Sequence, residues 1–314
     1  MSLDPDLAAH FANVAAAVPP PASASPMHRR ARLEAAAARF PYPPDAVVRS
    51  DHWLHLPGRE LMARVYRPRA GRLPAVLYLH GGGWVIGSVQ THDGACAALA
   101  ADADVVVASV QYRRAPENPW PAPNDDAYAA LEWLVAAADV LDIDARRIAV
   151  GGDSAGAHLA LGVAIEARDR AGPAIARQLL IYPVLEPRFD TASYREYATS
   201  PALTRAEMVD FWEAYLPDGF DTGDARAVPT RASLRGLPPA QVIVAGLDPL
   251  CDEGVALARA LDDAGVATTV VNEATLAHGF LRAAPYVPRA RAAMIAFGRE
   301  AGAALRVPGE PVAP

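Results

Sequence analysis

Residues 147–161, Arg147-Ile-Ala-Val-Gly-Gly-Asp-Ser-Ala-Gly-Ala-His-Leu-Ala-Leu161, join a strand pattern, a glycine-bounded turn and a helix pattern. The run Ile148–Val150 is typical of a short buried strand, and the stretch that begins at Ala155 has the composition of a helix. Ser154 stands between them in Gly-Asp-Ser-Ala-Gly, which fits the pattern G-x-S-x-G. Small residues on both sides of a serine permit a strained turn that lifts its hydroxyl clear of a sheet. The stretch therefore predicts a nucleophile elbow.

Short apolar runs alternate with helical patterns along most of the chain. The runs are bounded by Gly, Pro or Asp, as buried strands usually are; they cover residues 63–66, 75–79, 105–110, 148–150, 178–182, 241–245 and 268–271. The helical patterns cover residues 91–101, 125–138, 155–171, 255–264 and 289–304. Strands that alternate with helices predict an α/β fold with a mostly parallel sheet and helices on both faces.

The first segment that departs from this alternation is residues 1–45. Leu7, Phe11 and Val14 recur at helical spacing, prolines interrupt the pattern, and a second alanine- and arginine-rich helix is expected over residues 28–40. Such a segment is either a loosely docked arm or a lid over a site.

The second such segment is residues 186–227, which insert a helix without an adjoining strand. Thr204 and Glu207 have the spacing of a capping box at its start. The helix carries Phe211 and Trp212, and an aromatic stripe of this kind serves either as core packing or as a wall of a substrate pocket. We expect the insertion to act as a lid.

A run of three glycines follows the predicted strand Leu73–Leu79, in His80-Gly-Gly-Gly-Trp84. Because consecutive glycines cost conformational entropy on folding, the run needs a reason. A flexible turn and a phosphate-binding loop are the alternatives, but a Walker loop also needs a lysine. The preferred interpretation is an oxyanion hole, in which the N–H groups of Gly82, Gly83 and Ala155 meet the oxygen that becomes negative during acyl transfer.

The composition excludes several other functions. All 29 basic residues are arginine, so mechanisms that need a lysine amine, such as Schiff-base chemistry, are excluded. A formal net charge of −7 argues against nucleic-acid binding. The two cysteines, Cys96 and Cys251, form no metal-binding pair, and no metal or cofactor is expected.

The hydropathy pattern contains no run of eighteen apolar residues, so no membrane span is expected. The first ten residues, MSLDPDLAAH, carry acidic residues where a signal peptide carries positive charge. Cytoplasmic localisation is the expectation.

A serine nucleophile needs a base, and the chain has eight histidines. His278 follows a predicted strand and fits the order serine, acid, histidine that this architecture uses. Asp248 stands just past the strand 241–245, where site residues of open α/β sheets collect. Asp252 and Glu253 are the rival acids, although both are expected in the first turn of the next helix.

These motifs resemble the hormone-sensitive-lipase-like carboxylesterases, a branch of the α/β hydrolases marked by HGGG and GDSAG. The resemblance extends from Leu73 to Phe280, and it is carried by the following ordered motifs: His80-Gly-Gly-Gly-Trp84, Tyr112-Arg-Arg-Ala-Pro-Glu117, Gly152-Asp-Ser-Ala-Gly156, Asp248-Pro-Leu-Cys-Asp-Glu253 and His278-Gly-Phe280.

The resemblance implies an eight-stranded α/β-hydrolase sheet with a helical cap. The cap would comprise residues 1–45 and 186–227, and the catalytic core residues 46–185 and 228–314. It also implies hydrolysis of short- to medium-chain esters by Ser154, Asp248 and His278, with a small-molecule ester as substrate, no cofactor and, as is frequent in the family, a homodimer. Candidate pocket residues are Trp84, Phe211 and Trp212. An amidase or arylformamidase activity, or a non-catalytic ligand receptor, remains an alternative.

Overall fold

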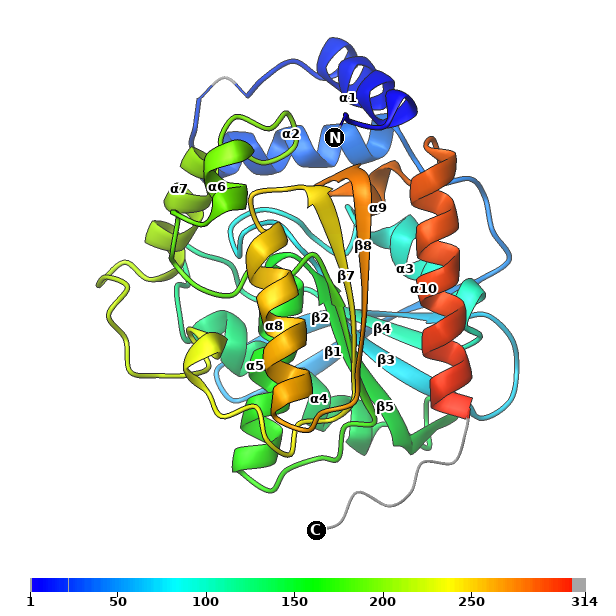
Figure 1. Cartoon of the computed structure of the whole chain (residues 1–314). Coiled ribbons are helices and arrows are strands. Elements are labelled where there is room, and N and C mark those ends of the chain that lie inside the picture. The colour runs from blue at the N-terminus through cyan, green and yellow to red at the C-terminus, as the bar shows by residue number, and fades with distance from the viewer. Residues whose placement is uncertain (1, 22, 307–314) are drawn as a thin grey trace.

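An eight-stranded sheet runs through the centre of the computed structural model, which describes residues 2–21 and 23–306 (Figure 1). The strands are β1 (Val48–Leu56), β2 (Arg59–Arg67), β3 (Leu73–Leu79), β4 (Val106–Val110), β5 (Ile143–Asp153), β6 (Arg177–Ile181), β7 (Ala240–Leu247) and β8 (Thr268–Ala277). Their order across the sheet is β1-β2-β4-β3-β5-β6-β7-β8. The strands from β4 to β8 pair in parallel, whereas β2 pairs antiparallel with both β1 and β4. The prediction of a mostly parallel sheet is therefore confirmed.

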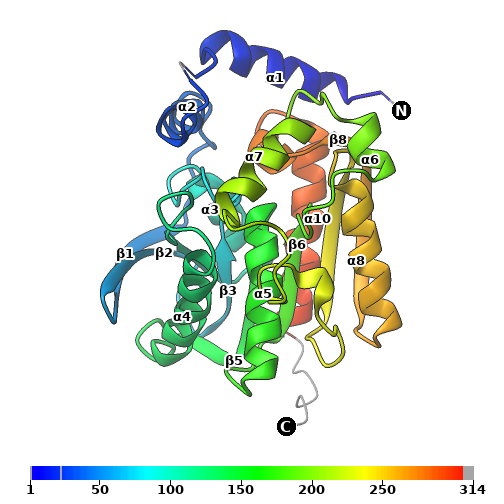
Figure 2. The ribbon, with the colours of Figure 1, turned by 90° about the vertical axis from the view of Figure 1, so that its left-hand side faces the viewer.

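Helices cover both faces of the sheet, as Figures 1 and 2 show. They are α1 (Pro5–Ala17), α2 (Pro26–Arg39), α3 (Asp93–Ala103), α4 (Ala122–Ala136), α5 (Ala155–Asp169), α6 (Ala192–Glu196), α7 (Arg205–Tyr215), α8 (Cys251–Asp263), α9 (Phe280–Ala283) and α10 (Pro288–Arg306), with a short 3₁₀ turn at Pro229–Arg231. All seven residues of β3 are buried because the strand is covered on both faces. Val76 and Tyr78 pack in the core shared with α3 and α10, and Leu77 packs in the core shared with α4, α5 and α8.

The helix expected from Asp125 begins three residues earlier than the composition indicates. Helix α4 starts at Ala122, with Pro123 in its first turn. Proline is tolerated there because the first helical N–H groups have no partner within the helix. The helix thus begins inside a proline-rich stretch, and composition alone did not reveal where the helix starts.

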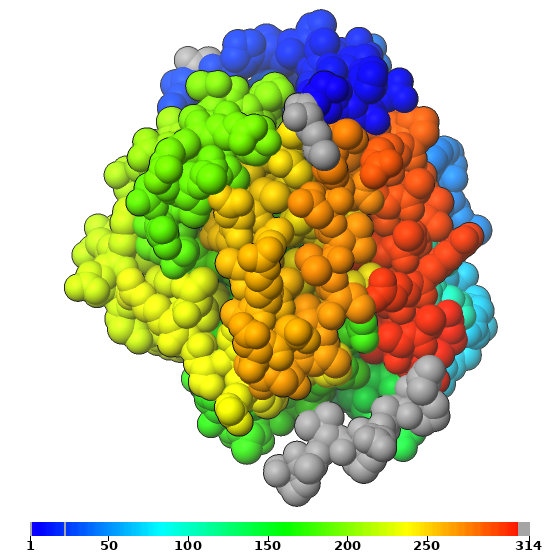
Figure 3. Space-filling model, in the orientation of Figure 1, coloured from blue at the N-terminus to red at the C-terminus, as the bar shows by residue number. Residues whose placement is uncertain are grey.

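The amino-terminal helices lie at one end of the molecule, together with α6 and α7 (Figures 2 and 3). Arg30 anchors α2: its Nε donates to the Val85 carbonyl oxygen at 2.7 Å, and its other nitrogens pair with the Glu117 carboxylate. The Arg29 guanidinium lies 4.2 Å from the centroid of the Phe211 ring on α7. The hydrogen bond from the half-buried Arg30 guanidinium to Val85 is worth about 1.5–3 kcal/mol, whereas the ion pair with the exposed Glu117 adds about 1 kcal/mol or less. These contacts dock α2 against the loop that contains Val85 and against α7.

The carboxyl ends of the parallel strands meet beneath these helices. Ser154 follows β5, Asp248 follows β7, and His278 follows β8. Because parallel strands end at one edge of the sheet, three distant segments of the chain meet there. Within residues 2–21 and 23–306, none of the helices has the length and apolar character that a membrane span requires.

Candidate active site

Ser154 occupies a strained turn between β5 and α5. Its φ of 55° and ψ of −120° lie outside the regions that L-residues ordinarily adopt. The turn needs small neighbours, because a Cβ on Gly152 or Gly156 would overlap the carbonyl oxygen of Leu79. The Ser154 N–H donates to the Ile181 carbonyl oxygen at 2.9 Å, which ties the turn to β6. The strand, turn and helix expected around Ser154 are confirmed.

His278 lies between Ser154 and Asp248. Its Nε2 is 3.0 Å from Ser154 Oγ, and its Nδ1 is 2.7 Å from Asp248 Oδ2. Since the ionised carboxylate only accepts hydrogen bonds, Nδ1 carries the proton and Nε2 is left to accept from the serine hydroxyl. The Asp248 side chain is fully buried and that of His278 is 11% exposed. The structure thus brings together the serine, histidine and acid that the sequence proposed.

The rival acids take structural positions in the first turn of α8. Asp252 Oδ2 accepts the N–H of Ser193 at 2.9 Å. Glu253 Oε2 accepts the N–H groups of Leu185 and Glu186 at 2.8 and 3.2 Å, where the chain leaves the sheet after β6. Burial raises the pKa of Glu253 well above its ordinary value. Neither carboxylate contacts His278.

The glycine loop turns tightly after β3. Gly82 and Gly83 have φ values of 121° and 56°, which favour glycine, and the N–H groups of Val85 and Ile86 donate back to the Gly82 carbonyl. A Cβ on Gly83 would overlap the Phe211 ring. Among the described residues, no protein acceptor takes the N–H groups of Gly82, Gly83 or Ala155. These three donors are therefore available to a ligand oxygen.

Asp153 joins the glycine loop to the elbow. Its Oδ1 accepts the Gly81 N–H and the Tyr78 hydroxyl, each at 2.9 Å, and His92 Nε2 lies 3.3 Å away. Burial by itself would raise the pKa of Asp153, but His92, Arg282 and the Tyr78 hydrogen bond outweigh it and hold the pKa well below its usual range. Asp153 occupies the first variable position (x) of the motif G-x-S-x-G, and the sequence alone gave it no role. The only available signal was a carboxylate in an otherwise apolar segment.

His80 supports the same loop from within the core. Its ring stacks on Tyr112 at a centroid distance of 4.2 Å, and the Tyr112 hydroxyl donates to the His80 carbonyl at 2.7 Å. Burial lowers the pKa of His80 to about 3, so its imidazole is neutral near pH 7. The motif's histidine is thus a packing residue, and among the described residues it makes no hydrogen bond to Ser154.

The aromatic candidates for a substrate pocket are packed in the core. Trp84 and Trp212 have no exposed surface, and their ring centroids are 4.6 Å apart. Trp84 also donates from Nε1 to His158 Nδ1 at 3.3 Å. Phe211 is 5% exposed and packs on Gly83. None of the three lines the cavity beside His278, because their ring faces are already filled by one another and by neighbouring side chains.

That cavity has a volume of about 890 Å³ and lies between the amino-terminal helices and α9. Its wall is mainly apolar, with Phe11, Leu33, Phe40 and Pro201 among its residues, and His278 and Arg282 also line it. A mostly apolar cavity with a few polar groups is typical of small-molecule sites. Among the residues the structure describes, no group of three or more His, Cys, Asp or Glu side chains is arranged to hold a metal ion.

Comparison with known proteins agrees with this geometry. A family model described as alpha/beta hydrolase fold matches residues 76–282. The chain is 42% identical over 238 residues to the carboxylesterase NlhH of Mycobacterium tuberculosis, with 74% of each chain covered. It is 38% identical over 305 residues to the ethyl acetate hydrolase of Pseudomonas putida, with 90% of this chain and 93% of the relative covered.

Solved structures of esterases share the fold over nearly the whole chain. The thermostable esterase from Pseudomonas putida ECU1011 superposes with a TM-score of 0.90 at 34% identity, covering 98% of this chain and 100% of the other. The hyperthermophilic esterase from the archaeon Pyrobaculum calidifontis gives a TM-score of 0.88 at 38% identity, covering 96% and 99%. The elbow, the glycine loop and these matches together show that the chain belongs to the alpha/beta hydrolase family, in its hormone-sensitive-lipase-like carboxylesterase branch.

Proposed function

We propose that the protein is a serine carboxylesterase that hydrolyses short- to medium-chain acyl esters through an acyl-enzyme intermediate. The observation that carries the proposal is the continuous hydrogen-bonded series from Ser154 Oγ through His278 to Asp248, with distances of 3.0 and 2.7 Å. The names of the relatives, carboxylesterase and ethyl acetate hydrolase, support the same reaction.

The first half-reaction transfers the acyl group to the serine. His278 Nε2 takes the Ser154 proton as Oγ attacks the ester carbonyl, and the Asp248 carboxylate holds the tautomer that permits this transfer and stabilises the imidazolium. The carbonyl oxygen becomes negative in the tetrahedral intermediate. His278 then gives its proton to the departing alcohol, which leaves the acyl group on Ser154.

The N–H groups of Gly82, Gly83 and Ala155 stabilise the oxyanion. Preorganised donors act strongly there because the surrounding protein keeps water away from the developing charge. Asp153 holds the glycine loop against the elbow by accepting the Gly81 N–H at 2.9 Å, so the distance between the N–H donors of the loop and the nucleophile is fixed. In the second half-reaction, water attacks the acyl-enzyme with His278 as base and releases the acid.

The cap assignment belongs to the same proposal. Residues 1–45 and 186–227 form the cap over a core of residues 46–185 and 228–314. The Arg30 contacts to the loop after the glycines, and the packing of Arg29 on Phe211, support a cap in which the two segments act together. Such a cover keeps bulk water from the reacting ester.

A panel of substrates tests the proposed function against its nearest rival, amide hydrolysis. We expect p-nitrophenyl esters from acetyl to octanoyl to be hydrolysed, with turnover falling towards dodecanoyl, and the matching anilides and N-formyl aromatics to react far more slowly. A fluorophosphonate probe should label Ser154, as mass spectrometry of the peptide would show. Faster cleavage of anilides or N-formyl aromatics than of esters would favour the amidase, and absence of labelling would favour a non-catalytic receptor.

Gly83→Ala is expected to lower kcat by about a hundredfold or more, the loss seen when an oxyanion donor is displaced. The added Cβ would overlap the Phe211 ring and would require a φ of 56°, so the loop must shift. Gly58→Ala is the matched control, because Gly58 has a φ of 73° with no atom within 4 Å of the added Cβ. It imposes similar backbone strain away from the site, and both variants are compared by kcat and by thermal unfolding. Equal kcat values for the two variants would contradict the role of Gly83.

A further inference from the structure

The cavity beside His278 lies on one side of the reacting serine. His278, Gly279, Arg282 and Ala283 line it, whereas Ser154, the glycine loop and Ala155 do not. The cavity thus borders the imidazole and lies away from the three N–H donors. Because His278 gives its proton to the departing oxygen, the leaving alcohol must lie on the imidazole side. The cavity is therefore placed to receive the alcohol portion of an ester.

Arg282 places a positive charge on the wall of this cavity. It belongs to α9, and a Cβ on Gly279 would lie 3.3 Å from its Nη2, so the guanidinium lies against the residue that follows the base. Burial, and then the charge of Arg282, lower the pKa of His10 on the same cavity wall. The guanidinium thus lies on the cavity wall, and its charge also helps to hold the pKa of the buried Asp153 low.

Within residues 2–21 and 23–306, the Arg282 side chain has no hydrogen bond or ion pair. Five other arginines of this part of the chain also have neither, and all five are exposed to solvent: Arg39, Arg195, Arg235, Arg259 and Arg299. Arg282 is instead half-buried. A half-buried guanidinium without a protein acceptor has its donors available to a ligand, and a carboxylate matches its planar fork in two parallel hydrogen bonds.

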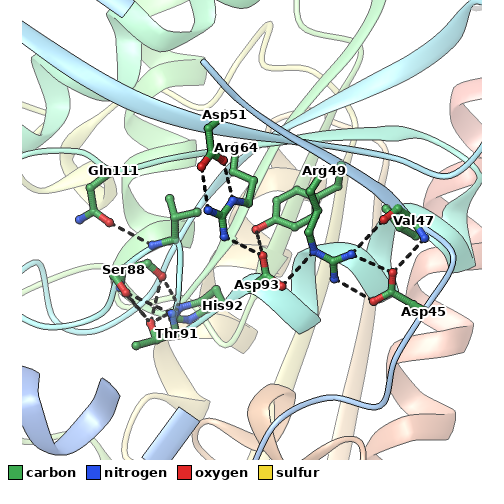
Figure 4. A network of polar contacts seen from close by, with 12 residues as sticks. Asp45, Val47, Arg49, Asp51, Arg64, Ser88, Thr91, His92, Asp93 and Gln111 are labelled. Atoms are coloured by element: carbon green, nitrogen blue, oxygen red, sulfur yellow. Dashed lines mark hydrogen bonds and ion pairs between the residues drawn. The ribbon is translucent and has the colours of Figure 1, made fainter. Parts of the chain in front are cut away.

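Each of the other charged side chains on the cavity wall makes at least one hydrogen bond or ion pair within the described residues. Arg49 pairs with Asp45 at 2.8 Å and with Asp93 at 3.0 Å, and Asp93 also accepts from Arg64, as Figure 4 shows. The Glu34 carboxylate accepts the Ser88 hydroxyl at 2.5 Å. Arg32 donates to the Pro19 carbonyl at 3.2 Å. Arg282 therefore remains as the cation beside the base with its donors free for a ligand.

We propose that Arg282 binds a carboxylate on the alcohol portion of the substrate, so that the preferred substrates are acyl esters of hydroxy acids. The proposal rests on the proposed function and names its substrate class. Water adds across the acyl–oxygen bond, the acyl group leaves as a carboxylic acid, and the alcohol oxygen takes the proton from His278. The second product is a free hydroxy acid whose carboxylate remains on Arg282 until release.

Matched pairs of esters test the proposal. Each pair consists of an anionic ester and its neutral carboxamide, which has nearly the same shape: acetoxyacetate, 3-acetoxypropanoate and 4-acetoxybutanoate, each beside its carboxamide. Acetate release gives kcat/KM for both members, and the readout is the ratio of the anionic to the neutral value. A hydrogen-bonded ion pair in a half-buried site should make this ratio about ten- to a hundredfold at the best chain length, mainly through KM.

Three variants assign the preference to Arg282. Arg282→Gln should bring the ratio close to one, and Arg282→Lys should restore part of it because it keeps the charge but loses the fork. Arg259→Gln is the matched control: it removes an equal charge from an exposed, unpaired arginine on α8 and should leave the ratio as in the wild type. Monoethyl succinate beside its carboxamide carries the charge on the acyl portion instead and should show no such preference.

Three results would overturn the proposal. One is a wild-type ratio at or below one for every chain length, which requires no variant to fold. Another is an Arg282→Gln protein in which kcat/KM falls by the same factor for the anionic and the neutral ester of each pair, as loss of a purely structural role would produce. The third is a charge preference confined to monoethyl succinate, which would move the carboxylate to the acyl side. Failure of the proposed function itself looks different, because neutral p-nitrophenyl acetate would then not be hydrolysed by the wild type.

Discussion

Ser154→Ala should abolish ester turnover, with kcat lower by roughly four to six orders of magnitude, the range measured when a triad nucleophile is removed from a serine hydrolase. The hydroxyl oxygen is 3.0 Å from His278 Nε2 and is the atom of the residue that attacks the ester carbonyl and carries the acyl group until water releases it. Alanine fits the elbow because it is smaller than serine, so the thermal unfolding transition should stay close to that of the wild type. Initial rates on p-nitrophenyl acetate, with thermal unfolding followed by circular dichroism, measure both effects.

The matched control is Ser50→Ala, which removes a hydroxyl from β1, at the far edge of the sheet from the site. It should retain wild-type kcat and fluorophosphonate labelling, whereas Ser154→Ala should lose both. Near-full activity of Ser154→Ala would refute the assigned nucleophile, and loss of labelling in the Ser50 variant would show that the probe does not report on the site.

Asp248→Asn should lower kcat by about three to four orders of magnitude, as the same substitution does in other serine hydrolase triads. Nδ1 of His278 donates to the Asp248 carboxylate at 2.7 Å. An asparagine amide can turn its NH₂ group towards Nδ1, which then accepts, and the ring proton moves to Nε2. An imidazole in that tautomer cannot take the serine proton. Single-turnover rates of acylation measure this step directly.

Asp252→Asn is a sharp control, because it makes the same chemical change four residues away in the rival carboxylate. Asp252 accepts the Ser193 N–H at 2.9 Å and does not contact His278. We expect its kcat to stay within about tenfold of the wild type, since the amide oxygen can still accept the Ser193 N–H and even loss of that hydrogen bond would cost only about 1 kcal/mol. A larger kcat loss for Asp252→Asn than for Asp248→Asn would reverse the assignment of the acid.

Local sequence patterns were sufficient to predict most strands of the sheet and the turn that holds Ser154. Every apolar run expected as a strand lies within or overlaps a strand, and most of these runs are buried, because covered strands need continuous apolar sequence. The run 268–271 is the exception, since it lies on the edge strand β8 and is largely exposed. The elbow was also predictable. The Leu79 carbonyl leaves no room for a Cβ on Gly152 or Gly156, so this turn requires glycine at both positions, and the two glycines are visible in the sequence.

The roles of the aromatic residues could not be predicted from local sequence patterns. Trp84 and Trp212 lie 128 residues apart in the chain and 4.6 Å apart in space, each filling the other's ring face. Composition cannot tell an aromatic that packs on another from one that faces a ligand, because both have the same hydrophobic signal. Only the tertiary arrangement decides which of the two applies.

Asp153 and Arg282 were also beyond sequence reasoning, for opposite reasons. The role of Asp153 depends on a partner N–H that comes from Gly81, in a distant loop. The interest of Arg282 lies in the absence, among the described residues, of a hydrogen-bonded or ion-paired acceptor for its side chain, and a sequence with 36 acidic residues gives no sign of that. Pairing between distant residues is a property of the folded chain.

The amino-terminal segment supplies most of the wall of the cavity beside His278, from His10 to Arg49, and none of the bond-making groups. Most of the residues that contact the alcohol portion therefore lie in a different stretch of the chain from the reacting groups, with Arg282 on α9 as the exception. Substitutions among these wall residues can change which alcohol portions are accepted, while the hydrogen bonds among Ser154, His278 and Asp248 stay unchanged. A library confined to the first fifty codons, screened for new leaving groups, should therefore yield active clones at a higher frequency than one spread across the whole chain.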